Sequence, residues 1–150
     1  MNKIRVGMLL DNSWFDTQEE EARDILRSLR GYLGEDSIKS WEVSRGFATL
    51  LKAEVPFDLL VVDYGGVAVQ GAWDLAEGEI KRCLEWGRDH PSSLVLIWTH
   101  YTERVYQGEL EEAFGHPDNL FFRYTEGKEA YDAFASKLRV WFGVEQKDEP

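Results

Sequence analysis

Short apolar runs and longer amphipathic segments alternate along the whole chain. The runs are rich in Val, Ile, Leu and aromatic residues, and such runs are typical of strands buried on both faces of a sheet. The run at 40–45 differs, because Trp41, Val43 and Arg45 alternate with polar neighbours, which indicates a strand nearer a sheet edge. The predicted strands cover residues 4–10, 40–45, 59–62, 94–98 and 120–122.

The segments between these strands carry apolar residues at the three- and four-residue spacing of helices that bury one side. Thr17 and Glu20 have the spacing of a capping box, and residues 19–21 supply an acidic first turn. Asp74 and Glu77 form a second box of the same kind. The predicted buried stripes lie within 22–33, 47–51, 76–87, 106–114 and 131–142, with Gly31 or Gly34 ending the first helix, Thr102 capping the fourth and Gly143 ending the last.

Five strand–helix units in succession predict an α/β protein with a parallel sheet and helices on both of its faces. The length of 150 residues suits one domain. We expect this domain to cover residues 1–144 as a three-layer α/β/α sandwich. The polar residues 145–150 are expected to form a flexible tail.

The charge balance narrows the classes of partner. There are 17 Lys and Arg against 28 Asp and Glu, so the net charge is 17 − 28 = −11. This argues against direct binding of nucleic acid or of an anionic membrane. The single cysteine, Cys83, excludes a disulfide scaffold. We see neither a signal peptide nor a membrane span, and therefore expect a cytoplasmic protein.

Open parallel sheets bind ligands beyond the carboxyl ends of their strands, and the residues there form the candidate site. Asp11 and Asp63 end two of the predicted strands, and their carboxylates suit a hard cation such as Mg²⁺. Both aspartates could instead cap the following turn or helix. The predicted rim of the binding site consists of Asn12, Trp14, Tyr64, Gly65, Gly66, Tyr101, Arg123 and Tyr124.

Several of these residues also have a purely structural interpretation. Gly65 and Gly66 lack the spacing of known phosphate-binding loops, so they can equally form a plain turn. The aromatic residues can cover the ends of the core rather than bind a partner. His100, His116 and Cys83 show no metal-ligand spacing.

A family resemblance rests on the first strand with Asp11 and on two further stretches. Residues 46–51 read Gly-Phe-Ala-Thr-Leu-Leu, and residues 56–63 read Pro-Phe-Asp-Leu-Leu-Val-Val-Asp. In this pattern the chain resembles the response-regulator receiver domain over about its first 145 residues. The resemblance implies a flavodoxin-like sheet in the order 2-1-3-4-5. It also implies Asp63 at the phosphoacceptor position and Thr99 at the position of the hydroxyl that senses the phosphoryl group.

The sequence departs from the receiver pattern at three places. Asn12 stands where receivers carry a second acidic residue, and the loop at 65–71 lacks the usual Met-Pro and Asp-Gly pairs. The fifth strand continues as Arg123-Tyr124-Thr125 and lacks the Lys-Pro of receivers. We therefore predict a non-enzymatic signalling or protein-interaction domain with an incomplete phosphoacceptor site and a protein partner, of open identity and oligomeric state.

Two alternatives stay open beside this interpretation. Asp11 and Asp63 could serve a metal-dependent phosphohydrolase or nuclease, since Asp11-Asn12-Ser13 is similar to the first-strand signature of PIN-type nucleases. The net charge of −11 could instead mark an acidic protein that binds a basic or nucleic-acid-binding partner. The sequence favours a domain without catalytic activity but leaves the enzyme open.

Overall fold

The chain folds into alternating strands and helices. The computed structural model describes residues 3–10, 17–44, 56–63, 72–98, 112–115, 117–123 and 128–144. The strands are β1 (Ile4–Leu10), β2 (Ile38–Ser44), β3 (Leu59–Asp63), β4 (Leu94–Trp98) and β5 (Leu120–Arg123). The helices are α1 (Gln18–Leu33), α3 (Ala72–Asp89) and α5 (Lys128–Phe142). No helix in these ranges is long and apolar enough to cross a membrane.

All five strands pair in parallel, in the order β2-β1-β3-β4-β5. This strand order and direction are those of the flavodoxin-like fold, as predicted. Strand β3 is buried along its whole length because β1 and β4 flank it and helices cover both faces. The continuous apolar runs of the sequence are thus the central strands of the sheet.

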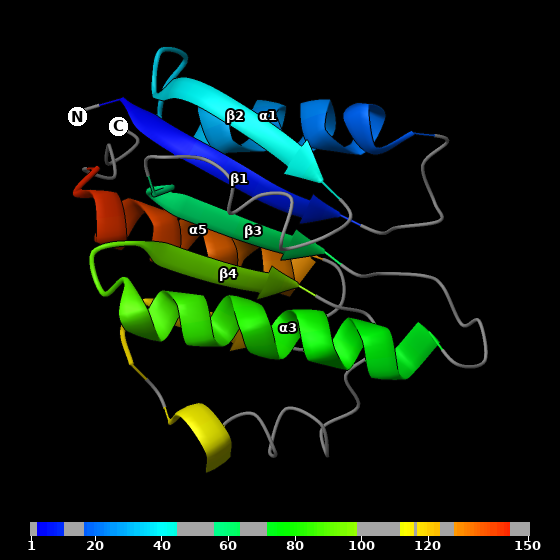
Figure 1. The fold of residues 1–150 in the computed structure, drawn as a ribbon. Helices are drawn as coiled ribbons and strands as arrows, with labels where there is room; N and C mark the ends of the chain where they lie inside the picture. Colours follow the sequence, from blue (N-terminus) through cyan, green and yellow to red (C-terminus); the bar gives the residue numbers. More distant parts are fainter. Residues whose placement is uncertain are drawn as a thin grey trace.

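The helices form two layers around the sheet (Figure 1). Helix α3 covers one face, where its side chains Ile80, Cys83 and Leu84 pack on Leu60 and Val62. Helices α1 and α5 cover the other face in a second core cluster. Neighbouring residues of β3 join different clusters because side chains alternate between the two faces of a sheet. The predicted three-layer sandwich is confirmed.

The ends of α1 and α5 follow the predicted capping residues. Thr17 caps α1, and its hydroxyl accepts a hydrogen bond from the Glu20 amide at 3.0 Å. Gly34, not Gly31, ends this helix with φ of 116°, a conformation that other residues rarely adopt. Helix α5 ends before Gly143, whose φ of 69° is in the left-handed region that favours glycine.

Two predicted boundaries are wrong. Strand β2 begins at Ile38 instead of residue 40, because pairing with β1 starts at Ile4 and continues past an irregularity in register. Helix α3 begins at Ala72, so Asp74 lies inside its first turn instead of capping it. An acidic residue is favourable at either place because of the helix dipole, so the sequence pattern did not separate the two positions.

Other predicted elements lie partly or wholly outside the described residues. These are the short helix at 47–51, most of the helix at 106–114 and the tail at 145–150. Residues 112–114 are helical, which agrees with the predicted end of that fourth helix. Strand β3 extends one residue further than predicted, so that Asp63 is its last paired residue.

Candidate functional site

The carboxyl ends of four strands lie level with one another. The register places Leu10 beside Asp63, Asp63 beside Trp98 and Trp98 beside Arg123. The last residues of β1, β3, β4 and β5 therefore form one row across the sheet. This row is the edge at which flavodoxin-like folds bind ligands.

Asp63 lies in the middle of the row and is only 6% exposed. It is on the same face of β3 as Leu59 and Val61, which belong to the core cluster beneath α1 and α5. Burial of a carboxylate is costly unless polar groups replace its lost hydration, so such a residue is uncommon in a core made for stability alone. The predicted candidate Asp63 thus holds a central and buried position.

Helix α1 begins at the same edge of the sheet. The Gln18 side-chain amide Nε2 donates a hydrogen bond to the Leu10 carbonyl at 2.8 Å. This bond ties the first turn of the helix to the end of β1, across the segment that carries Asp11 and Asn12. Nothing in the sequence singled out Gln18, because a glutamine in a helical first turn is ordinary.

A second buried carboxylate belongs to the first turn of α1. Glu21 is 2% exposed, whereas Glu19 and Glu20 are exposed. The sequence predicted only that all three residues favour the start of a helix. Glu21 thus places a buried carboxylate in the first turn of the helix that begins beside the end of β1.

Most of the predicted rim and metal-site residues, together with the predicted hydroxyl sensor, are outside the described part of the chain. These residues are Asp11, Asn12, Trp14, Tyr64, Gly65, Gly66, Thr99, Tyr101 and Tyr124. Arg123 is described through its backbone, as the last residue of β5. It lies two strands away from Asp63, a distance of about 10 Å between backbones.

The described residues offer no ready-made metal cluster. Within the ranges given above, no group of three or more His, Cys, Asp and Glu side chains could hold a metal ion. Cys83 of α3 is buried in the core cluster between this helix and the sheet. His100 and His116 lie outside these ranges. Of the two predicted metal ligands, Asp11 and Asp63, the structure describes Asp63.

Comparison with known proteins finds likeness in solved structures but none to a protein-family model or a curated protein. The chain is similar to the receiver domain of the Francisella response regulator 1452, with 13% sequence identity and a TM-score of 0.46. This likeness covers 94% of the present chain and 98% of the other. The flavodoxin-like fold follows from this chain's own strand order and parallel register.

Proposed function

We propose that this chain is a signalling or protein-interaction domain on the receiver plan, with an incomplete phosphoacceptor site. The observation that carries the proposal is the buried position of Asp63 at the carboxyl end of the central strand β3. Leu10 and Trp98 flank it in the sheet, and they are followed in the sequence by Asp11 and Thr99. The strands that carry the receiver-like residues are therefore neighbours of β3.

Phosphorylation of Asp63 would require more than the carboxylate itself. One carboxylate oxygen would form a bond to phosphorus while the bond from phosphorus to its leaving group breaks. A divalent cation and a nearby positive charge stabilise the charge that spreads over the phosphoryl oxygens. Asn12 offers the cation a neutral amide where a receiver offers a carboxylate, and the strand-five lysine is missing. We therefore expect Asp63 not to be phosphorylated.

An output that does not depend on phosphorylation has to come from binding a partner. Trp14, Tyr64, Tyr101 and Tyr124 belong to the segments that follow the strand ends. Tyrosine and tryptophan are enriched in protein interfaces, where they provide large contact areas at a low cost in conformational entropy. A protein partner at this edge of the sheet fits these residues better than a small substrate does.

Incubation with acetyl phosphate and Mg²⁺ tests the phosphorylation state directly. Intact-protein mass spectrometry should show no species heavier by about 80 Da, the approximate mass of an added phosphoryl group. A genuine receiver domain treated in parallel is the positive control, and Asp63→Ala is the matched variant. A heavier species that appears in the wild type and is absent from Asp63→Ala would overturn the proposal of an incomplete site.

Titration with Mg²⁺ distinguishes between the interpretation as a binding domain and the interpretation as an enzyme. Trp14 lies close in sequence to Asp11, so fluorescence of the wild type compared with Trp14→Phe reports on a cation at this place. Weak or no binding, without hydrolysis of nucleotides or nucleic acids, is expected. Metal-dependent hydrolysis that is lost in Asp63→Asn would instead identify a phosphohydrolase or nuclease.

A further inference from the structure

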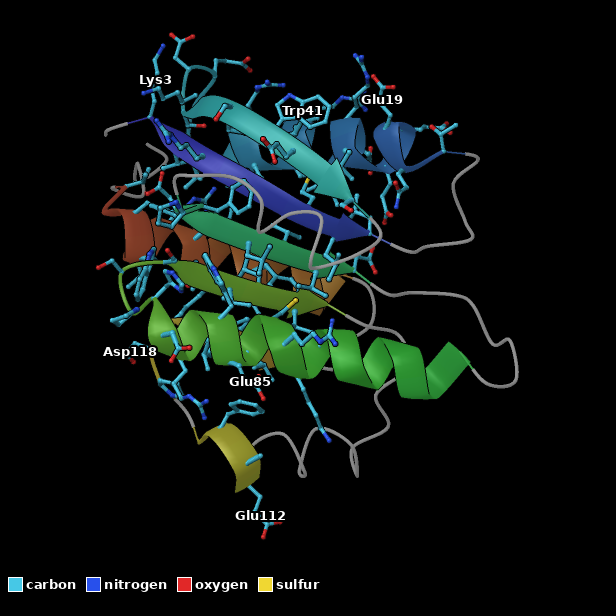
Figure 2. All side chains as sticks on the ribbon, in the orientation of Figure 1. Lys3, Glu19, Trp41, Glu85, Glu112 and Asp118 are labelled. Atoms are coloured by element: carbon cyan, nitrogen blue, oxygen red, sulfur yellow. The ribbon has the colours of Figure 1, made fainter. Side chains whose placement is uncertain are left out.

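A cationic groove lies along the outer side of the molecule, between α1 and the edge strand β2. Its cavity measures about 350 Å³, which is within the range of ligand-binding sites. Trp41 of β2 is at this outer edge, beside α1 (Figure 2). The lining residues are Arg23, Leu26, Arg27, Arg30, Glu35 and Trp41.

The three arginines form a row because of their spacing on the helix. Arg23, Arg27 and Arg30 follow the four- and three-residue steps that bring side chains to one side of a helix. They flank the buried stripe on the side that faces β2 and Trp41. From Arg23 to Arg30 the helix rises by about 10 Å, so the positive charge is spread along the groove.

The opposite flank of α1 is covered by α5. There, Arg139 Nε of α5 donates to the Tyr32 carbonyl at 3.4 Å, and its guanidinium lies 5.7 Å from the centre of the Tyr32 ring. The arginine row therefore faces away from α5 and toward the sheet edge. The groove is also separate from Asp63, which ends β3 beyond β1.

The arginine row stands out against a chain with a net charge of −11. Arg23 pairs with Glu19 at 2.8 Å and Arg27 with Asp24 at 3.6 Å, each on the same helix. Both pairs are well exposed to solvent, and such pairs contribute little to stability. An incoming anion can therefore replace Glu19 and Asp24 as a partner. On the lining itself, Glu35 is the carboxylate that such an anion would have to avoid.

Strand β2 offers a second kind of contact. It is the outermost strand, and the described residues place no further strand beyond it. A free strand edge can accept an extended peptide through main-chain hydrogen bonds. In an extended peptide, every second side chain recurs after about 7 Å. This repeat is close to the rise of about 6 Å between Arg23 and Arg27.

We propose that this groove binds an extended acidic peptide of a protein partner. The peptide lies along the outer edge of β2 and presents carboxylates at alternate positions to Arg23, Arg27 and Arg30. Trp41 forms an apolar wall of the groove and the buried Leu26 forms its floor. Both contact the aliphatic parts of the peptide's acidic side chains. Charge complementarity selects the acidic sequence, and the strand edge selects the extended conformation.

Fluorescence anisotropy with a labelled peptide of alternating Glu and Thr tests the proposal on the full chain. The wild type should bind this peptide, more weakly as salt rises, and should not bind a peptide with Lys in place of Glu. Arg27→Glu should lower the affinity by about tenfold or more, since it replaces a charge-assisted hydrogen bond with repulsion. Arg27 is 81% exposed, so the variant should fold normally, which circular dichroism checks.

Arg88→Glu is the matched control, because it makes the same change of charge on α3, across the sheet. An equal loss of affinity in Arg27→Glu and Arg88→Glu would overturn the groove as the site. A peptide with methylated alternate amides should bind more weakly, and equal binding would overturn the pairing with β2. Failure of the Glu-Thr peptide to bind, or its displacement by inorganic phosphate or short DNA at matched charge, would overturn the choice of an acidic peptide. None of these results depends on the phosphorylation of Asp63.

Discussion

The two ends of the parallel sheet use polar side chains differently. At the amino ends, a polar residue stands directly before each of β2, β3, β4 and β5. Each of these four side chains bonds to the main chain. At the carboxyl end, Asp63 is the buried polar residue among the strand side chains that the structure describes. The four residues at the amino ends are Ser37, Asp58, Ser93 and Asn119.

At the amino ends, the polar side chains form hydrogen bonds with main-chain groups of neighbouring segments. Ser37 Oγ donates to the Gly34 carbonyl at 2.7 Å, and Ser93 Oγ donates to the Phe57 carbonyl at 2.6 Å. The Asp58 carboxylate accepts from the amide of Arg5 at 2.8 Å. Such residues satisfy backbone groups that helices and strands leave unpaired.

Asn119 contacts more main-chain groups through its side chain than the other three residues do. Its side-chain amide donates to the carbonyls of Gly87 at 2.7 Å, Ser93 at 3.1 Å and His90 at 3.4 Å. It thereby joins the end of α3 to the start of β4. At the amino ends these four side chains pair with main-chain groups, whereas at the carboxyl end the buried Asp63 is the residue for which we propose a role in binding.

Asn119→Ala should have the largest effect on stability. It removes the donor shared by three carbonyls that are largely shielded from water, and we expect a loss of about 3 kcal/mol in the free energy of unfolding. Urea denaturation measures this loss. Asn119→Asp, which keeps the size but lacks the N–H donors, should cost at least as much. A loss below about 1 kcal/mol in both variants would contradict a structural role for the amino ends.

Gly87→Ala should have the next largest effect, in the same part of the molecule. A methyl group on Gly87 would meet the side chains of Leu120 and Val95, the latter at 2.7 Å. Overpacking of this kind should cost about 2 kcal/mol. Gly31→Ala is the matched control, because Gly31 also lies in a helix but has nothing within 4 Å of the new methyl group. Gly31→Ala should stabilise the protein by about 1 kcal/mol. A loss of stability in Gly31→Ala as large as that in Gly87→Ala would refute the packing argument.

Thr17→Ala tests a polar residue at the carboxyl end whose role is structural. It removes the hydroxyl that accepts from the Glu20 amide, and should cost about 1 kcal/mol. Thr17→Ser keeps the acceptor and should cost much less. Thermal unfolding of both variants gives the comparison. If the two lost equal stability, the side chain would matter for some reason other than capping.

The sequence predicted the fold well because its signals are local. The runs at 59–62 and 94–98 are apolar throughout, as central strands must be. The start of strand β2 was missed, since a single apolar residue, Ile38, is followed there by the exposed Lys39. The capping role of Thr17 was visible from the spacing of two residues.

The site was less predictable because it depends on contacts between distant segments. Asp63 was found through the pattern of its own strand and its resemblance to receivers. Burial of Glu21 depends on tertiary packing around the first turn of α1, which the sequence of that turn does not show. The spacing of Arg23, Arg27 and Arg30 was readable, but their groove needs Trp41 from a later strand.

Asp63→Asn should change the free energy of unfolding far less than Asn119→Ala does. The amide has nearly the same shape as the carboxylate and costs less to bury, so we expect a change of at most about 1 kcal/mol. We propose that Asp63 is kept for binding at some expense in stability, so the variant should be as stable as the wild type while losing partner binding. Urea denaturation beside Asn119→Ala makes the comparison under one set of conditions. A loss for Asp63→Asn as large as that for Asn119→Ala would make Asp63 a structural residue, and the contrast between the two ends of the sheet would then fail.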